Sequence, residues 1–143
     1  MGFNGGFGTG EIKSAIILIF SSLFCLNSIA RDWTEITKGQ NGHIFFVDME
    51  NLNESSGYIY FWQLINYNEK DEYGDMAAKI YVKADCEVFK FKWLKVSYHK
   101  MLMGKDYVKP DNPSKLVSGW QYPSIGSTSY AVLDHVCKNK GLL

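Results

Sequence analysis

Apolar and polar residues alternate along much of this chain, in short segments separated by turn residues. A period of two is typical of a strand with one buried face, and aromatic and β-branched residues favour strands. The pattern predicts strands at residues 32–37, 43–48, 58–67, 76–84 and 85–99. Turn residues at 39–42 and 69–75 indicate hairpins, which join antiparallel neighbours, whereas residues 51–57 are expected to form a loop.

The longest predicted strand, 85–99, begins at a cysteine and changes phase halfway along. Its apolar positions are odd-numbered up to Trp93 and even-numbered from Leu94. One inserted residue, a β-bulge, changes the parity of a strand and bends the sheet. We therefore expect a bulge or a strong bend at Trp93-Leu94, or else a strand that is covered on both faces there.

A helical pattern appears only near the end of the chain. Tyr130, Leu133 and Cys137 recur at i, i+3 and i+7 and predict a helix over residues 130–138. Residues 126–129 supply candidate caps. Residues 101–118, which contain prolines and a glycine, are expected to form an excursion without a regular element.

The first 30 residues have the pattern of a secretory signal peptide. Residues 15–26 are apolar, and the small side chains of Ser28 and Ala30 precede Arg31. Such a run is typical of an export signal and is shorter than the roughly 20 apolar residues that span a bilayer. We expect cleavage after Ala30, which leaves a single domain at residues 31–143. Phe24 before Cys25 does not match a lipoprotein signal.

Two cysteines remain once the signal is removed. Cys86 starts the longest predicted strand and Cys137 lies in the predicted helix. An even number of cysteines in an oxidising compartment indicates a disulfide. A Cys86–Cys137 bond would tie the helix to the sheet, and closing a loop of about 50 residues restricts the unfolded chain by roughly 4 kcal/mol on the chain-entropy model.

Charge gives no evidence for a polyanionic partner of the whole molecule. The chain has 15 basic and 15 acidic residues and a formal net charge of zero, so it has no global field for nucleic acid or an anionic membrane. One basic and aromatic group stands out locally: Lys90, Lys92, Lys95 and Lys100 with Trp62, Trp93 and Tyr98. Such a group can bind single-stranded nucleic acid, but in a neutral exported chain it favours a solvated face or a docking surface for an acidic protein.

No catalytic, metal or cofactor motif is visible in the sequence. His43, His99 and His135 lie on separate predicted elements without neighbours at a zinc-ligand spacing. The serines of residues 124–129 lack a nucleophile-elbow pattern, and no phosphate-binding glycine loop occurs. We expect no enzyme activity, metal or cofactor. Convergence of a histidine with a carboxylate and a nucleophile in a cleft would revive the enzyme alternative.

Several short motifs occur in a characteristic order over residues 33–138. They are Trp33, Phe45-Phe46-Val47-Asp48, Trp62, Asp85-Cys86-Glu87, Gly119-Trp120-Gln121-Tyr122-Pro123 and Val136-Cys137-Lys138. This order resembles the bacterial surface-adhesin protein E family. The resemblance implies an α+β fold, with an antiparallel sheet of about six strands and one C-terminal helix packed on its concave face and tied by the disulfide.

The same resemblance implies a non-enzymatic, exported binding protein of a Gram-negative bacterium. Its expected partners are host or extracellular proteins, such as the matrix and serum proteins laminin and vitronectin, and the expected location is the periplasm, the outer-membrane surface or the medium. No membrane span is expected after signal removal. The oligomeric state stays open, with a homodimer among the alternatives, and no binding residues are predicted.

The alternative function belongs to a different class. It is a soluble periplasmic module that binds an envelope protein, or a small ligand in an aromatic cleft between helix and sheet. A well-formed apolar pocket with converging polar groups would favour the small ligand.

Overall fold

The structure is a computed structural model that describes residue 2 and residues 31–140. The predicted signal peptide, with its cleavage after Ala30, falls outside the described part of the chain apart from Gly2. Arg31 is the first residue of one compact unit. Within residues 31–140, no helix has the length and hydropathy needed to cross a membrane.

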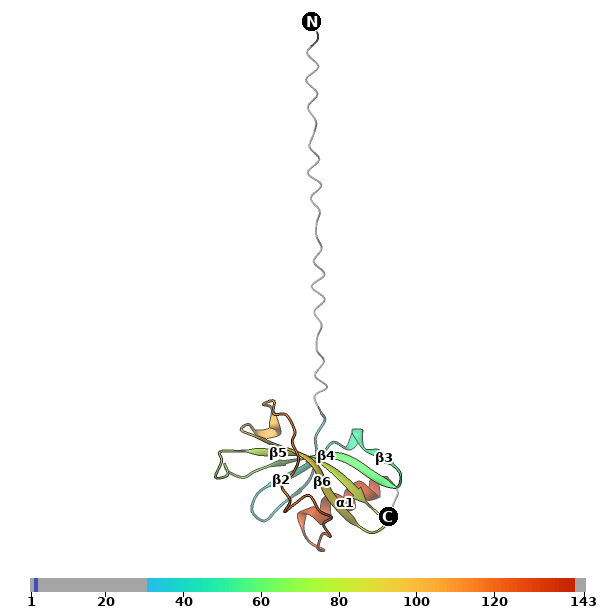
Figure 1. Ribbon diagram of the computed structural model, residues 1–143. Coiled ribbons are helices and arrows are strands. Elements are labelled where there is room, and N and C mark those ends of the chain that lie inside the picture. The colour runs from blue at the N-terminus through green and yellow to red at the C-terminus, as the bar shows by residue number, and fades with distance from the viewer. Residues whose placement is uncertain (1, 3–30, 141–143) are drawn as a thin grey trace. The chain divides into compact units, whose positions relative to one another are not determined.

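Residues 31–140 form an antiparallel sheet of six strands and one α-helix (Figure 1). The strands are β1 (Thr34–Lys38), β2 (Ile44–Val47), β3 (Asn53–Ser55), β4 (Tyr58–Asn66), β5 (Ala77–Asp85) and β6 (Lys90–His99). The helix is α1 (Thr128–Asn139), and η1 (Met49–Asn51) and η2 (Leu102–Gly104) are 3₁₀ turns. The sheet order is β1-β2-β4-β5-β6, and β3 pairs with the part of β4 that β2 leaves free. The predicted fold class is confirmed.

The loop predicted at residues 51–57 is wrong in part, because β3 lies within it. All three residues of β3 are exposed, so no apolar alternation announces the strand. Its pairing with Tyr58–Tyr60 of β4 holds it instead. Ser56 and Gly57, with φ angles of 52° and 82°, make the tight turn between the two strands.

The predicted strand 85–99 starts too early, because Cys86 lies in a turn. Strand β5 continues to Asp85, residues 86–89 form the turn, and β6 begins at Lys90. The Asp85 Oδ1 atom accepts a hydrogen bond from the Val88 N–H at 3.0 Å, and Phe89 has a φ of 61°. A side chain that bonds the backbone a few residues later favours a turn over continued strand pairing.

The predicted bulge in β6 is confirmed. Tyr81 pairs with Lys95, whereas the next residue of β5, Val82, pairs with Trp93, so Leu94 is the extra residue. The insertion restores the alternation after the change of phase. As a result Trp93 and Val96 lie on the same face of β6.

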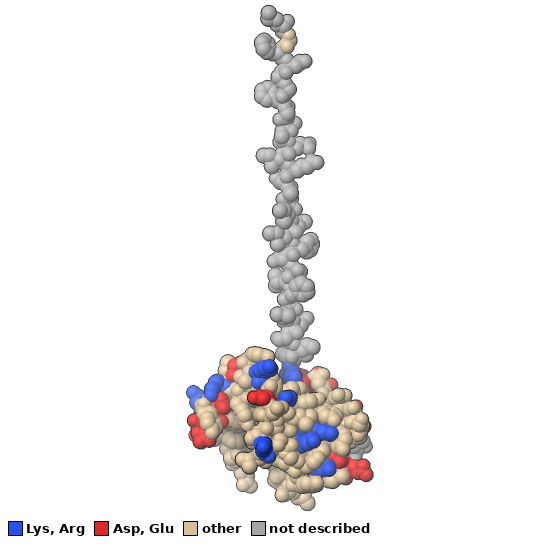
Figure 2. Space-filling view, in the orientation of Figure 1, with Lys and Arg blue, Asp and Glu red and all other residues tan. Residues whose placement is uncertain are grey.

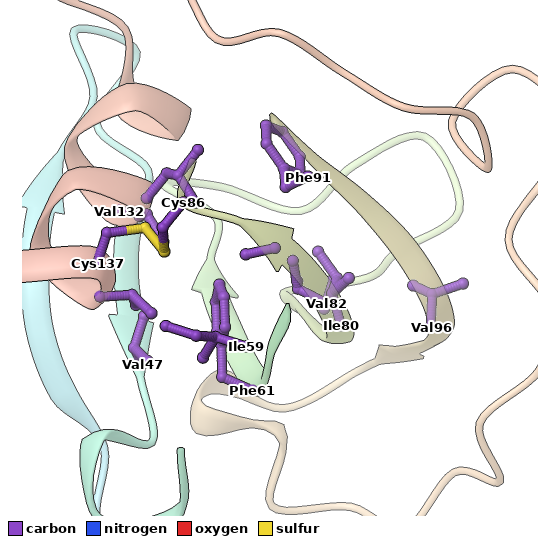
Figure 3. Packing of buried hydrophobic residues seen from close by; sticks show 14 residues of the cluster. Val47, Ile59, Phe61, Ile80, Val82, Cys86, Phe91, Val96, Val132 and Cys137 are labelled. Carbon is purple, nitrogen blue, oxygen red and sulfur yellow. A yellow bond between two sulfur atoms is a disulfide. The ribbon is translucent and has the colours of Figure 1, made fainter. Parts of the chain in front are cut away.

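Helix α1 packs on one face of the sheet, and the core lies between them (Figure 3). Its buried residues are Val132, Leu133, Val136 and Cys137. Ser127 caps the helix by accepting a hydrogen bond from the Tyr130 N–H at 3.1 Å. The disulfide between Cys86 and Cys137 joins the β5–β6 turn to the last part of α1, so this end of the helix is fixed to the sheet.

The segment between β6 and α1 runs along the outer edge of β6. Val96 exchanges two backbone hydrogen bonds with Asp111, and Phe91 exchanges two with Gln121. These bridges satisfy part of a strand edge that would otherwise be unpaired. The Gln121 bridge also fixes the position of the neighbouring Trp120, which the sequence alone does not place on the sheet.

Candidate functional site

The face of the sheet opposite α1 is lined by aromatic and basic side chains. In β4, Ile59 and Phe61 belong to the core, and because successive side chains point to opposite faces, the residues between them point away from it. We call this second face the helix-free face. It carries Tyr58, Tyr60 and Trp62 of β4, Tyr81 and Lys83 of β5, and Lys90, Lys92 and Lys95 of β6.

Three aromatic rings pack together in the middle of this face. The ring centroids of Trp62 and Tyr81 lie 5.1 Å apart, and those of Tyr60 and Tyr81 lie 6.2 Å apart. The rings are tilted by 30° and 33°, and such pairs contribute about 0.5–1.5 kcal/mol each beyond their buried area. All three side chains are only half-buried, so they form a rigid apolar strip that stays accessible to solvent.

A group of cations surrounds Trp120 at one end of the strip. The Nζ atoms of Lys90, Lys92 and Lys83 lie 4.4, 4.9 and 5.9 Å from the Trp120 ring centroid. The Lys83 Nζ atom also lies 3.9 Å from the centroid of Tyr58, whose ring stacks on Trp120 at 6.0 Å. We call these five residues the Trp120 cluster. Ring faces attract ammonium groups by about 0.5–1 kcal/mol at exposed sites, which offsets part of the repulsion between the lysines.

No salt bridge in the described part of the chain involves the lysines of the Trp120 cluster. The salt bridges there involve Asp48, Asp75, Asp106 and Asp134, and none reaches these lysines. Elsewhere basic and acidic side chains are interspersed among neutral ones over the visible surface (Figure 2), as expected from a net charge of zero. The cluster is therefore a local positive site and not part of a global field.

Arg31 marks the other end of the strip. Its guanidinium lies 4.5 Å from the Trp62 ring centroid, and its Nη1 atom lies 3.8 Å from Asp48 Oδ2. Asp48 is buried, and its carboxylate accepts hydrogen bonds from the Asn51 amide at 2.9 and 3.0 Å. Burial lowers the pKa of Arg31, and the Asp48 carboxylate partly opposes that effect. The strip thus has a cation at each end.

A cleft beside Trp62 contains a serine, a histidine and an aspartate. The segment around η2 covers this end of the helix-free face, on the side of the sheet away from α1 (Figure 1), and leaves a cavity of about 270 Å³. Ser97 Oγ lies 2.7 Å from His99 Nε2, and His99 Nδ1 lies 2.8 Å from the Asp106 carbonyl oxygen and 3.4 Å from its carboxylate. The structure therefore brings together the three groups that the enzyme alternative requires.

The hydrogen bonds of this cleft are those of a structural anchor. A carbonyl oxygen only accepts, so His99 donates from Nδ1 to Asp106, and the Ser97 hydroxyl is the hydrogen-bond partner of His99 Nε2. The Asp106 carboxylate instead accepts from the Lys100 and Met101 N–H groups at 3.0 and 3.2 Å. Burial alone would raise the pKa of Asp106, but these bonds lower it. Ser97 is 3% exposed, so covering side chains would have to move before a substrate could reach its hydroxyl.

Within residues 31–140, two cavities lie between α1 and the sheet. The first measures about 70 Å³ and is lined mainly by apolar side chains, with Gln63, Gln121 and Ser129 as the polar ones; pockets that enclose a small-molecule ligand measure roughly 300–1,000 Å³. The second, of about 500 Å³, is an open pocket between the β1–β2 hairpin and the start of α1, and its lining includes the polar residues Lys38, Gln40 and Asn41. The apolar cavity is therefore too small for a ligand, and the larger one is not the apolar, aromatic cleft that the alternative requires.

The basic and aromatic residues singled out in the sequence divide between two faces. Lys90, Lys92, Lys95 and Trp62 share the helix-free face, whereas Trp93 and Tyr98 pair in register with the core-facing Val82 and Ala78. Lys100 lies beyond β6 and bonds the Asp75 carboxylate at 2.8 Å.

Sequence reasoning missed six residues at this face: Tyr58, Tyr60, Tyr81 and Lys83 on the strands, and Arg31 and Trp120 outside them. Period-two parity could have found the four strand residues, because they lie opposite the apolar positions of β4 and β5. Trp120 and Arg31 reach the face through irregular segments, for which no local signal exists.

The three histidines stay on separate elements. His43 precedes β2, where its Nδ1 accepts a hydrogen bond from the Asn68 N–H at 3.1 Å and its ring lies 5.2 Å from Tyr67. His99 ends β6 in the cleft, and His135 is exposed on α1. Among the residues that the structure describes, no three His, Cys, Asp or Glu side chains are grouped so that they could hold a metal ion.

A family comparison matches most of the chain. The family model described as surface-adhesin protein E matches residues 33–138. No curated protein matches the sequence.

Solved structures with the same fold include those of Haemophilus influenzae protein E. Crystal form II of that protein aligns with a TM-score of 0.58 at 14% identity, and the alignment covers 76% of this chain and 89% of the other. A second structure has the same score and identity and covers 78% and 87%. Protein E from non-typeable Haemophilus influenzae gives 0.55 at 14% identity, with 76% and 77% covered. At this identity the likeness shows the fold alone.

Proposed function

Because the chain belongs to the surface-adhesin protein E family, we propose that it is an exported, non-enzymatic adhesin that binds host or extracellular proteins. The expected partners are matrix and serum proteins such as laminin and vitronectin. The expected location is the cell surface or the medium, with the periplasm as the location of the alternative function.

The observation that carries the proposal is the accessible aromatic strip with a cation at each end. Tryptophan, tyrosine and arginine are the residues that contribute most to protein–protein binding energy. Trp62, Tyr60 and Tyr81 are half-buried in the free protein, beside Arg31. A partner that covers the strip would gain apolar burial without ordering new side chains, because the rings already hold one another in place.

The cavities beside α1 favour this proposal over the small-ligand alternative. The apolar one, of about 70 Å³, is well below the volume of common ligand sites. The larger one, of about 500 Å³, is open and has polar residues such as Lys38, Gln40 and Asn41 in its lining, whereas common ligand sites are mainly apolar. An envelope protein stays a candidate partner, because it would use the same kind of surface.

The test is binding of the exported protein to immobilised laminin and vitronectin. Trp62→Ala removes the largest ring of the strip and is expected to weaken binding at least about tenfold, as for a hot-spot residue. Tyr73→Ala is the matched control, since Tyr73 is an aromatic residue that is 74% exposed and lies in the connection between β4 and β5, outside the strip. Equal binding by Trp62→Ala and the wild type would exclude the strip as the binding site.

Fractionation of the native organism tests the location. Protein at the cell surface or in the medium supports adhesion. Protein confined to the soluble periplasm would favour the alternative, a periplasmic partner.

A further inference from the structure

We propose that the Trp120 cluster is a docking site for an acidic segment of a protein partner. The inference rests on the proposed function and deepens it, because it names the chemistry of the partner and the residues that select it. The site consists of Lys83, Lys90 and Lys92 as cations, with Tyr58 and Trp120 as the rings that hold them.

The charges in the cluster are incompletely compensated. Three Nζ atoms lie within 5.9 Å of one ring centroid, and no salt bridge in the described part of the chain involves them. Asp85 faces Lys90 in the strand register, but no salt bridge joins the two, and this single carboxylate stands against three ammonium groups. Carboxylates supplied from outside would relieve the repulsion between the lysines.

The rings preorganise the lysines for such a ligand. A lysine side chain is flexible, and fixing it on binding costs conformational entropy. Here Lys83, Lys90 and Lys92 are half-buried, and each ammonium group lies close to a ring face. Part of the ordering has therefore taken place before the partner arrives.

The same contacts disfavour ligands that stack on aromatic rings. Nucleic-acid bases bind single-strand sites by lying on exposed ring faces, and sugars of polysaccharides also pack on such faces. The Tyr58 ring is contacted by Lys83 at 3.9 Å and by the stacked Trp120 ring at 6.0 Å. What the cluster presents to solvent is therefore ammonium groups more than free rings, which favours carboxylates.

The adjoining aromatic strip sets the line along which the acidic segment would lie on the sheet. Tyr58, Tyr60 and Trp62 follow one another along the same face of β4, so they cover about 13 Å at the rise per residue of a strand. An extended segment with carboxylates at the Trp120 cluster would place its apolar side chains on Tyr60 and Trp62. A further carboxylate at its other end would lie near Arg31.

The experiment uses a fluorescein-labelled polyglutamate peptide as the probe and fluorescence anisotropy as the readout, on the exported protein. Polyglutamate is expected to bind, with an affinity that falls as salt is added. Lys90→Gln/Lys92→Gln should weaken binding by about tenfold or more, because two of the three ammonium groups around Trp120 are lost. Lys83→Gln alone should weaken binding by a smaller factor, since two ammonium groups remain.

The matched control is Lys109→Gln/Lys115→Gln, which removes two exposed lysines outside the cluster. This variant should bind the peptide as the wild type does. Thermal unfolding of all variants checks that they fold. Equal losses in the control and the cluster variant, or no polyglutamate binding by the wild type, would overturn the inference.

Two further measurements distinguish the possible classes of partner. Heparin serves as a sulfated polysaccharide, and binding of heparin without binding of polyglutamate would overturn the inference in favour of a polysaccharide site. Polyglutamate binding by a protein that binds neither laminin nor vitronectin would support the acidic-segment site and count against the proposed function. Laminin or vitronectin binding that polyglutamate does not inhibit would overturn the inference and leave the proposed function standing.

Discussion

Removing the disulfide should destabilise the domain by roughly 4 kcal/mol on the chain-entropy model, because the bond closes a loop of about 50 residues. The two cysteines are 51 positions apart, and both are buried. The double variant Cys86→Ala/Cys137→Ala avoids unpaired thiols. Measured losses for small secreted domains are typically about 2–5 kcal/mol, a large share of the stability of a domain of this size.

Urea unfolding followed by circular dichroism measures the loss directly. At about 4–8 °C per kcal/mol, a loss of this size should also lower the melting temperature by more than roughly 10 °C. Reducing agent should destabilise the wild type to the same extent and leave the variant unchanged, which is the internal control. A loss below about 1 kcal/mol, or reductant sensitivity in the variant, would refute the reasoning.

The loss of stability should be largest in one region of the domain. Because the bond ties α1 to the β5–β6 turn, native-state hydrogen exchange in the variant should accelerate first in the amides of Thr128–Asn139. The amides of β4 and β5, which are central in the sheet, should stay protected until global unfolding. Uniform acceleration in both regions would contradict a local role for the bond.

Two further predictions follow from single side chains, and a third from the predicted signal peptide. Burial raises the pKa of Tyr67 to about 12, so the contribution of Tyr67 to stability should be constant below pH 10 and be lost as the pH rises from about 10 to 12, where the unfolded tyrosine ionises first. Tyr67→Phe should lose this part of the pH dependence, and an unchanged profile would contradict it. Ser97→Ala should cost about 1–3 kcal/mol, because it leaves the buried His99 Nε2 without its hydrogen-bond partner, and ester hydrolysis by the wild type that disappears in this variant would instead revive the enzyme alternative. Mass spectrometry of the exported protein should find Arg31 as its first residue, and retention of residues 1–30 would contradict the predicted cleavage.

The sheet and its irregularity could be predicted because their signals are local. The change of parity at Trp93-Leu94 identified the bulge, since a strand can change phase only by inserting a residue or being covered on both faces. The two cysteines that lie after the predicted signal peptide likewise left one pairing. The helix was recognised from its apolar stripe, and its observed bounds differ by two residues at the start and one at the end.

The surface could not be predicted to the same extent, because its residues come together through long-range contacts. Strand β3 has three exposed residues and exists through its pairing with β4. Trp120 reaches the helix-free face because Gln121 bridges to Phe91. Ser97 and His99 are two positions apart on one strand, but Asp106 joins them only through the fold of the segment after β6.

The central claim is that the helix-free face is the surface that binds proteins. The most direct measurement is hydroxyl-radical footprinting of the exported protein bound to laminin or vitronectin, because oxidation reports the accessibility of side chains. The partly exposed side chains of Tyr60, Trp62, Tyr81 and Trp120 should be oxidised less in the complex, and the exposed His135 of α1 should not change. Protection of His135, with Trp62 unaffected, would contradict the claim.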